Sequence, residues 1–251
     1  MTAWPPLPRP GLARLHQLIL ALVFLTRLPL GRWLPPRVLP LADAAWAFPL
    51  AGLAVAALAV APMALAGPGL LPAALTLALI CWLTGALHED ALADFADAGG
   101  GRTPEDRLRI MRDSTIGSFG AAALVAALAI RLTALAAVGP WALIGAAAFG
   151  RAVPVALMRG LPPARGDGLG HGAGRPSFRA VAAALVIGAA ALILTAPGPV
   201  AGLAGVVAGA LAGLAVALRA RRLLGGQTGD VLGAAILSAE TAALVGMALS
   251  T

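Results

Sequence analysis

The run AAWAFPLAGLAVAALAVAPMALA, residues 44–66, is followed after Gly67 and Pro68 by a second apolar run, GLLPAALTLALICWLTGAL, residues 69–87. Each run is long enough to cross the hydrocarbon core of a bilayer as one helix, which takes about 20 residues. A Gly-Pro pair between two such runs is typical of a tight turn. The two runs therefore predict a helical hairpin inside a membrane.

Further apolar runs of similar length occupy much of the remaining chain. They cover residues 118–139, 141–158, 180–196, 198–218 and 231–249. The shorter stretch 15–30 has arginine on both sides, which favours an interfacial or re-entrant helix over a span. We therefore expect residues 1–251 to form a single all-α domain, a polytopic membrane helix bundle with about seven transmembrane helices and a short N-terminal interfacial or re-entrant helix.

Composition excludes an ordinary water-soluble domain. Of the 251 residues, 60% are hydrophobic and only 12% are charged, with a mean hydropathy of +0.90, whereas soluble domains are roughly one quarter charged. The formal charge of +7 comes from 18 basic residues, all arginine, scattered through short segments between apolar runs. That distribution does not form a nucleic-acid-binding face, so we expect the lipid bilayer as partner and no nucleic acid.

The placement of the arginines predicts the orientation, because positive residues near helix ends stay on the cytoplasmic side. With the N-terminus inside, sixteen of the eighteen arginines fall in cytoplasmic segments, and only Arg131 and Arg151 lie in predicted spans. The sixteen are Arg9, Arg14, Arg27, Arg32, Arg37, Arg102, Arg107, Arg109, Arg112, Arg159, Arg165, Arg175, Arg179, Arg219, Arg221 and Arg222. Every acid except Glu240 shares that side, so we expect a multi-pass protein of the bacterial inner membrane with a cytoplasmic active site.

The densest polar motif is ALHEDALADFADAGGGR, residues 86–102. Asp90, Asp94 and Asp97 have the spacing i, i+4, i+7, which places three carboxylates on one helix face, within an arc of about 60°. Like charges so arranged repel, and a hard cation such as Mg²⁺, which prefers oxygen ligands, would relieve the repulsion. We therefore predict a Mg²⁺ site on these aspartates, against the alternative of an acidic helix end facing water. Glu89, about 100° away around the helix, is expected to be a flank.

The residues after this motif suit a phosphorylated substrate. Arg102 and Arg112 offer planar donors that match phosphate oxygens. Asp113 and Ser114, in the run MRDSTIGSFG at residues 111–120, are good helix caps. Asp113 is also placed to join the metal cluster if the flanking helices are neighbours.

A third polar run, GGQTGDVLGAA at residues 225–235, opens the last predicted span. Asp230 would enter the bilayer there, which is costly unless it faces a polar cavity or has a partner, so a functional role is the default hypothesis. Glu240, Arg131 and Arg151 lie deeper in the spans. The sequence leaves open whether they pair with one another or whether some of them meet the substrate.

Two glycine-rich features remain. Gly205, Gly209 and Gly213 form a small-residue stripe in the run 198–218, which permits close helix packing within the chain or between copies in a homo-oligomer. The segment 159–179, which contains Arg165 and many glycines, is expected to be a flexible loop that closes over a nucleotide.

In order and spacing, four motifs resemble the cobalamin synthase family of adenosylcobinamide-GDP ribazoletransferases. They are FLTRLP at 24–29, HEDALADFAD at 88–97, RLRIMRDSTIGSFG at 107–120 and GGQTGDVLGA at 225–234. The match extends over residues 24–240, nearly the whole chain. One departure is Ala91, where a glycine commonly follows the first aspartate of the family motif.

The resemblance implies a Mg²⁺-dependent membrane enzyme that joins adenosylcobinamide-GDP to α-ribazole, or α-ribazole 5′-phosphate, and releases GMP. Mg²⁺ on Asp90, Asp94 and Asp97 would bind the pyrophosphate, and a ribose hydroxyl would attack the cobinamide-side phosphorus. The hydroxyl proton would pass to Asp113, Asp230 or His88. The expected substrate-binding residues are Arg102, Arg112, Ser114, Arg151, Gln227 and Thr228.

Two other functions compete with this one. A CDP-alcohol phosphotransferase of lipid synthesis also has spaced aspartates at a helix end, but its alanine-arginine pair and further downstream aspartates are missing from this sequence. A small-solute transporter would use Asp230, Glu240, Arg131 and Arg151 as a relay. Transporters commonly contain internal repeats, and this sequence shows no convincing repeat.

Overall fold

The computed structural model describes residues 10–36 and 39–251, and in these ranges the chain is helical without a strand. Arg9 and Arg37, which contributed to the predicted orientation, lie outside the described residues. The α-helices are α1 (Pro10–Leu25), α2 (Leu41–Ala44), α3 (Phe48–Ala59), α4 (Ala61–Ala66), α5 (Leu70–Thr84), α6 (Leu87–Asp97), α7 (Pro104–Ile110), α8 (Ser118–Val138), α9 (Pro140–Gly160), α10 (Gly168–Gly172), α11 (Phe178–Thr195), α12 (Pro199–Leu224) and α13 (Gly229–Ala248). Short 3-10 helices are η1 (Gly31–Trp33), η2 (Ala45–Ala47) and η3 (Ala98–Gly100).

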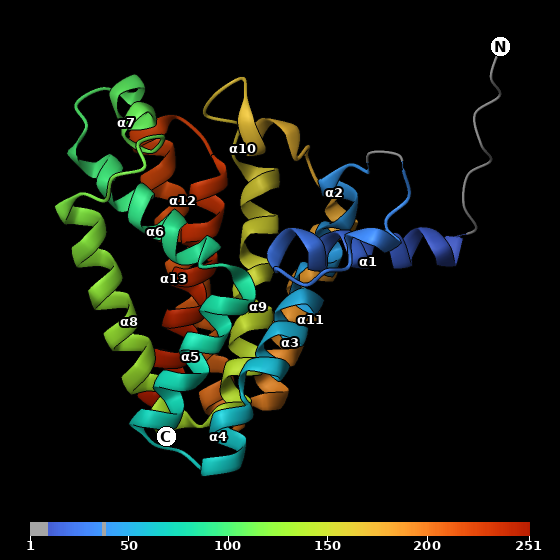
Figure 1. Ribbon diagram of the computed structural model, residues 1–251, viewed down its shortest axis with the longest axis vertical. Coiled ribbons are helices and arrows are strands. Elements are labelled where there is room, and N and C mark those ends of the chain that lie inside the picture. Colours follow the sequence, from blue (N-terminus) through green and yellow to red (C-terminus); the bar gives the residue numbers. More distant parts are fainter. Residues whose placement is uncertain (1–9, 37–38) are drawn as a thin grey trace.

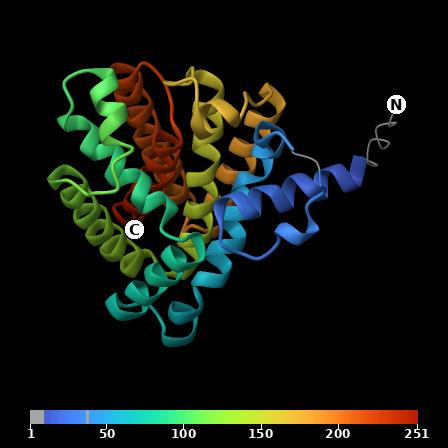
Figure 2. The same cartoon turned by 45° about the horizontal axis from the view of Figure 1, so that its top comes forward.

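The helix lengths confirm a multi-pass membrane fold. Within the described residues, six helices are long and apolar enough to cross a bilayer, and a seventh span is present if the bent pair α5 and α6 is counted as one. The shorter N-terminal apolar helix is also confirmed. This helix, α1, lies across the long axis of the bundle in both views (Figures 1 and 2).

The second predicted span, residues 69–87, is shorter than expected because the chain turns sharply. The helix α5 ends at Thr84, and Gly85 and Ala86 adopt positive φ angles of 69° and 57°. Glycine adopts this left-handed conformation readily, whereas alanine pays roughly 1 kcal/mol or more. The axes of α5 and α6 then differ by 87°. The aspartate motif therefore lies on a separate helix, α6, and does not continue α5 as one straight span.

Two other boundaries differ from the predictions for local reasons. The first predicted span is interrupted between α3 and α4, where Pro62 lacks the N–H that a continuous helix would need. The predicted span 198–218 continues as α12 to Leu224, because arginine is a good helix former and Gly225 stops the helix in the left-handed conformation.

The core forms around α9, whose residues are mostly buried and which packs against α3, α11 and α13. The helices α8 and α11 lie at the periphery and expose large apolar side chains such as Val125 and Leu194. A helix that is apolar all round is expected where lipid replaces water. The bundle thus has a tightly packed centre and an apolar outer surface.

The glycine stripe of α12 packs within the chain. An added Cβ would lie 3.1 Å from the Ala243 carbonyl oxygen at Gly205, 2.9 Å from the Ala239 carbonyl oxygen at Gly209, and 2.3 Å from Val153 at Gly213. The stripe therefore allows α12 to approach α13 and α9 closely, as small residues do between membrane helices.

Candidate active site

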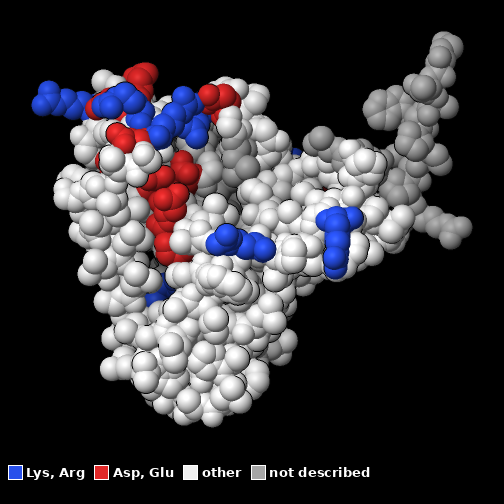
Figure 3. Space-filling view, in the orientation of Figure 1, with Lys and Arg blue, Asp and Glu red and all other residues white. Residues whose placement is uncertain are grey.

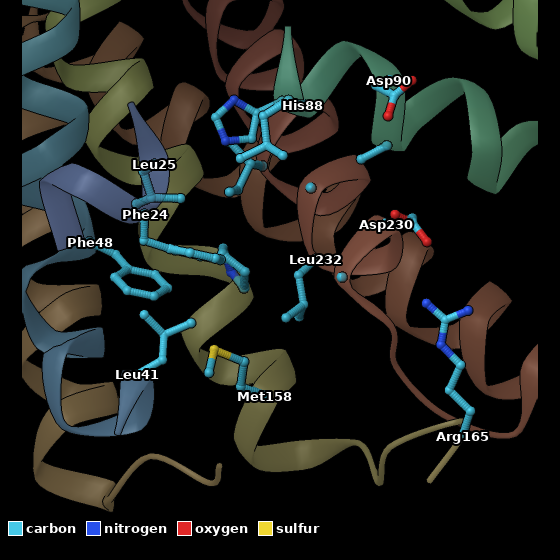
Figure 4. Close-up of a pocket in the computed structure, with 16 residues that line it drawn as sticks. Phe24, Leu25, Leu41, Phe48, His88, Asp90, Met158, Arg165, Asp230 and Leu232 are labelled. Atoms are coloured by element: carbon cyan, nitrogen blue, oxygen red, sulfur yellow. The ribbon is translucent and has the colours of Figure 1, made fainter. Parts of the chain in front are cut away.

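The site forms where α6 meets α13. Ala91 of α6 faces Gly233 of α13 so closely that a Cβ added to Gly233 would lie 2.5 Å from the Ala91 Cβ. This contact between two small residues lets the helices approach, and it brings Asp90 near Asp230 on the neighbouring helix (Figure 4). The two motifs that carry these aspartates are about 140 residues apart in sequence and adjacent in space.

Carboxylates accumulate at this junction. Asp94 is close enough to Asp90, Asp230 and Asp97 for each of their charges to act on it. On the face shown in Figure 3, acidic side chains form a column beneath a band of arginine side chains, at the end of the molecule that carries α7 and α10. The helix-face arrangement that the spacing predicted is therefore present on α6, and Asp230 extends it onto a second helix.

Asp97 has a different environment from the other aspartates. Its two carboxylate oxygens each accept a backbone N–H, from Gly117 and from Gly120, both at 2.8 Å. A Cβ on either glycine would come within 2.5 Å of an Asp97 oxygen. Asp97 therefore caps the first turn of α8, where backbone N–H groups lack partners within the helix.

Asp113 and Ser114 do not form that cap, contrary to the expectation from sequence. The N-cap of α8 is Gly117, and both Asp113 and Ser114 are exposed in the loop between α7 and α8. The Asp113 carboxylate accepts hydrogen bonds from the Thr115 side chain and backbone, which hold the pKa of Asp113 below its usual value. The structure does not bring Asp113 into the aspartate cluster.

The aspartates can provide only part of the coordination shell of a metal ion. Among the described residues, no group of three or more His, Cys, Asp or Glu side chains is arranged so that it could hold a metal ion by itself. Magnesium, however, is commonly held by one or two carboxylates together with substrate phosphates and water. Asp90, Asp94 and Asp230 provide hard oxygen donors of that kind, and they fit an ion shared with a phosphate.

A cavity of about 320 Å³ opens beside the aspartates, between α1, α3, α6, α9 and α13. Asp90, Asp230, His88 and Arg165 contribute its polar lining, and in Figure 4 the Arg165 guanidinium points toward Asp230. One guanidinium nitrogen of Arg165 is buried without a hydrogen-bond partner among the described residues. Sequence reasoning gave Arg165 no role beyond its loop, and nothing distinguishes it there from the other arginines of residues 159–179.

His88, predicted as a possible proton acceptor, lies in the wall of this cavity. Its side chain is buried, and the Nε2 atom has no hydrogen-bond partner in the described part of the chain. Buried polar atoms are normally paired. An unpaired one in a cavity wall is therefore available to a ligand.

The predicted phosphate-binding arginines of the cytoplasmic segments lie nearby on the surface. Arg112 donates to both carboxylate oxygens of Asp167, at 2.7 and 2.6 Å, which links the end of α7 to the segment that carries Arg165. The Arg102 side chain is exposed and makes no ion pair among the described residues. Contact of Arg102, Arg112 or Ser114 with the substrate remains a prediction.

Gln227 and Thr228, predicted to bind substrate, are buried and hold the backbone around the site. The Gln227 amide donates to the Gly170 carbonyl at 2.9 Å, and the Gln227 backbone pairs with Pro162 and Ala164. The Thr228 hydroxyl accepts the Val231 N–H at 3.2 Å and caps α13. These contacts fix Asp230 at the start of α13 and Arg165 on its segment.

Four further charged residues, none of which lines the cavity, form a buried network. Glu240 of α13 pairs with Arg131 of α8 and, at 3.3 Å, with Arg151 of α9. Arg131 also pairs with Glu89 of α6 at 3.1 Å. These four side chains belong to residues that are at most 8% exposed.

This network corrects two expectations. Arg151 is fully buried against Glu240, so the structure does not place it at a substrate surface. Glu89 is an ion-pair partner inside the bundle rather than a flank. The angular position of Glu89 on α6 correctly predicts that it lies on a different face from the aspartates. It does not predict the ion pair with Arg131, which is 42 residues away in the sequence.

Comparison with known proteins gives a consistent result. A family model described as Cobalamin-5-phosphate synthase matches residues 17–248. An adenosylcobinamide-GDP ribazoletransferase of Bradyrhizobium diazoefficiens is 46% identical over 225 residues, or 86% of each chain. Proteins of the same name from Azorhizobium caulinodans and Mesorhizobium japonicum are 42% and 44% identical, over 90% and 92% of this chain and 93% and 92% of theirs. No solved structure matches the chain.

Proposed function

The chain belongs to the cobalamin-5-phosphate synthase family, and we propose that it acts as an adenosylcobinamide-GDP ribazoletransferase at the junction of α6 and α13. A hydroxyl oxygen of α-ribazole, or of its 5′-phosphate, attacks the phosphorus on the cobinamide side of the diphosphate. The bond from that phosphorus to the bridging oxygen breaks and GMP leaves. The products are adenosylcobalamin, or its 5′-phosphate, and GMP.

The observation that supports this proposal most is the like-charged cluster of Asp90, Asp94 and Asp230. The carboxylates of Asp90 and Asp94 have no arginine partner within the described residues, and a diphosphate would be repelled by them unless a cation lay between. Mg²⁺ shared between carboxylates and phosphate oxygens would satisfy both anions. When bound, this ion would supply charge stabilisation to the developing phosphoryl transition state.

Arg165 complements the carboxylates from the segment between α9 and α10. Its guanidinium faces Asp230 in the cavity (Figure 4) and carries an unpaired buried nitrogen. Guanidinium groups bind phosphate oxygens with fixed geometry. We assign Arg165 to a phosphate of the substrate.

The position of the proton acceptor is restricted by the cavity. An acceptor must lie within hydrogen-bond reach of the attacking hydroxyl. His88 and Asp230 line the cavity, whereas Asp113 is exposed outside it. Of the three residues considered, His88 and Asp230 therefore remain candidates.

The same charge distribution supports a proposal for the orientation in the membrane. The end that carries α7 and α10 gathers the charged side chains, while the C-terminus and α4 lie at the opposite end (Figures 1 and 3). Positive residues favour the cytoplasmic side. We place this end, and the site, at the cytoplasmic face of the inner membrane, where nucleotide substrates are found.

The direct test uses the purified full-length protein in detergent or liposomes. GMP release from adenosylcobinamide-GDP is measured with and without α-ribazole, across a Mg²⁺ titration and with EDTA. We expect release only with both substrates and a divalent cation. Release that persists in EDTA would overturn the metal assignment, and no release with both substrates and Mg²⁺ would overturn the proposed reaction.

A further inference from the structure

The cavity beside the aspartates has a second end with a different chemistry. In Figure 4 the charged residues stand on one side of the view and apolar side chains on the other. The apolar end is lined by Phe24, Leu25, Leu41, Phe48, Met158 and Leu232. Phe24 and Phe48 stack with ring centroids 5.8 Å apart. A small ligand inside would thus have one end in an apolar, partly aromatic pocket and the other beside carboxylates and arginine.

The size of the cavity limits which part of a substrate can enter. About 320 Å³ is at the lower limit of small-molecule sites, which run from about 300 to 1,000 Å³. A corrin macrocycle is larger than this space. A bicyclic aromatic base with its ribose, or a guanine nucleoside, is of suitable size.

The few hydrogen-bonding groups in the cavity walls favour the base of ribazole over guanine. Guanine carries several donors and acceptors around its rings, and burying them without partners costs free energy. His88 lines the cavity together with these apolar side chains, and its unpaired Nε2 offers a single partner. The dimethylbenzimidazole base of ribazole has no N–H and one free ring nitrogen, so a single donor satisfies it.

We propose, given the proposed function, that this cavity binds the aromatic base of the ribazole substrate and that its apolar end selects the base. The base lies among Phe24, Phe48, Met158 and Leu232, with its free nitrogen accepting a hydrogen bond from the His88 Nε2, so that Asp230 and not His88 takes the hydroxyl proton. The ribose then points toward Asp90 and Asp230, where the diphosphate of the second substrate arrives from the charged surface. The wall that α1 contributes gives the N-terminal FLTRLP motif a role in substrate selection.

Base selection is tested by comparing α-ribosides that differ only in the base. The kcat/KM for GMP release is measured with α-ribazole and with the riboside of benzimidazole, which lacks both methyl groups. A methyl group in an apolar pocket is commonly worth about tenfold or more in kcat/KM. We expect the wild-type enzyme to prefer α-ribazole by at least that factor.

Met158→Ala should reduce this preference several-fold, because it removes the side chain that contacts the base end of the cavity. Met247→Ala is the matched control: Met247 is also buried, but it lies 17 residues beyond Asp230 on α13, about 25 Å along the helix. The control should keep the wild-type preference even if it lowers total activity. If Met158→Ala does not fold, Ile236→Val, a one-methylene change in the cavity wall, replaces it. This variant should also reduce the preference for α-ribazole.

The outcomes separate the two proposals. A wild-type enzyme that releases GMP but prefers neither base, or a preference unchanged in both Met158→Ala and Ile236→Val, would overturn the cavity assignment and leave the reaction intact. An equal loss of preference in Met247→Ala would also overturn it. A wild-type protein without GMP release would overturn the reaction, and the cavity assignment with it.

Discussion

Glu89 and Asp90 are adjacent in sequence, yet they belong to two different charge clusters. Glu89 points into the bundle, where Arg131 neutralises it and Glu240 joins the same network. Asp90 lines the cavity with Asp230 and lies close to Asp94, and the Asp90 carboxylate has no hydrogen-bond partner among the described residues. The number of acids on a helix is therefore less informative than whether each acid has a protein cation beside it. The paired cluster balances two carboxylates with two guanidinium groups, whereas Asp90 and Asp94 form no ion pair among the described residues, which is why we propose that a cation binds there.

The largest effect is expected at the centre of the unpaired cluster. Asp94→Asn keeps the size of the side chain and removes one negative charge, so the protein should insert and fold normally. GMP release should fall about 10²–10³-fold, because electrostatic stabilisation of this type contributes several kcal/mol to a transition state. The assay should cover a Mg²⁺ titration, since excess ion would partly rescue a weakened site. Near-normal turnover at every Mg²⁺ concentration would show that Asp94 is not part of a metal site.

A substitution in the paired cluster should lower the stability of the folded protein. Glu240→Gln leaves Arg131 and Arg151 buried beside each other without their shared carboxylate. Breaking a buried ion pair by removing one partner costs about 3–5 kcal/mol. We expect a marked decrease in the thermal unfolding temperature of the detergent-solubilised protein. An unchanged unfolding temperature would argue that the network is not structural, and Mg²⁺ should not rescue this variant.

Asp97 lies between the two cases, because it was predicted as a metal ligand and is observed as a helix cap. Asp97→Asn loses one of the two acceptors for the N–H groups of Gly117 and Gly120. Loss of a cap costs about 1 kcal/mol, so amide exchange should accelerate in the first turn of α8. The Mg²⁺ dependence of GMP release should stay as in the wild type. A shift like that of Asp94→Asn would restore Asp97 to the metal site.

The smallest effect is expected at Asp113. Its carboxylate is exposed, and its hydrogen bonds from Thr115 lower its pKa, so it stays ionised near neutral pH. Asp113→Asn should change kcat/KM by less than about threefold, since surface changes away from a site are usually small. This variant is a better control for Asp94→Asn than Glu89→Gln, which disturbs the buried network. A loss of activity comparable to that of Asp94→Asn would place Asp113 in the site.

The sequence predicts the spans and the shared face of the aspartates well, because both depend on local periodicity. The apolar runs locate α8, α9, α11 and α13 to within about two residues. The bend after α5 is less accessible, because the left-handed pair Gly85 and Ala86 includes an alanine. No residue type in an apolar run marks such a turn reliably.

The arrangement of the site could not be predicted from the sequence, because it depends on contacts between helices that are far apart in the chain. The close approach of α6 to α13 includes a tight contact between Ala91 and Gly233. The choice of partners among four buried charges depends on how four helices pack. The role of Asp97 depends on two glycines 20 and 23 residues later. Each of these contacts joins separate helices, so it is fixed by packing and not by spacing.

The walls of the cavity have a consequence for how the protein is made. They include Phe24 of the first helix and Ile236 of the last, with contributions from α3, α6 and α9 between them. Because synthesis proceeds from the N-terminus, the first wall residues wait in the membrane until nearly the whole chain has been inserted. A nascent polypeptide that still lacks α13 therefore lacks the wall formed by Asp230, Leu232 and Ile236. The enzyme becomes active only when the final helix docks, so biogenesis yields either a complete catalyst or none.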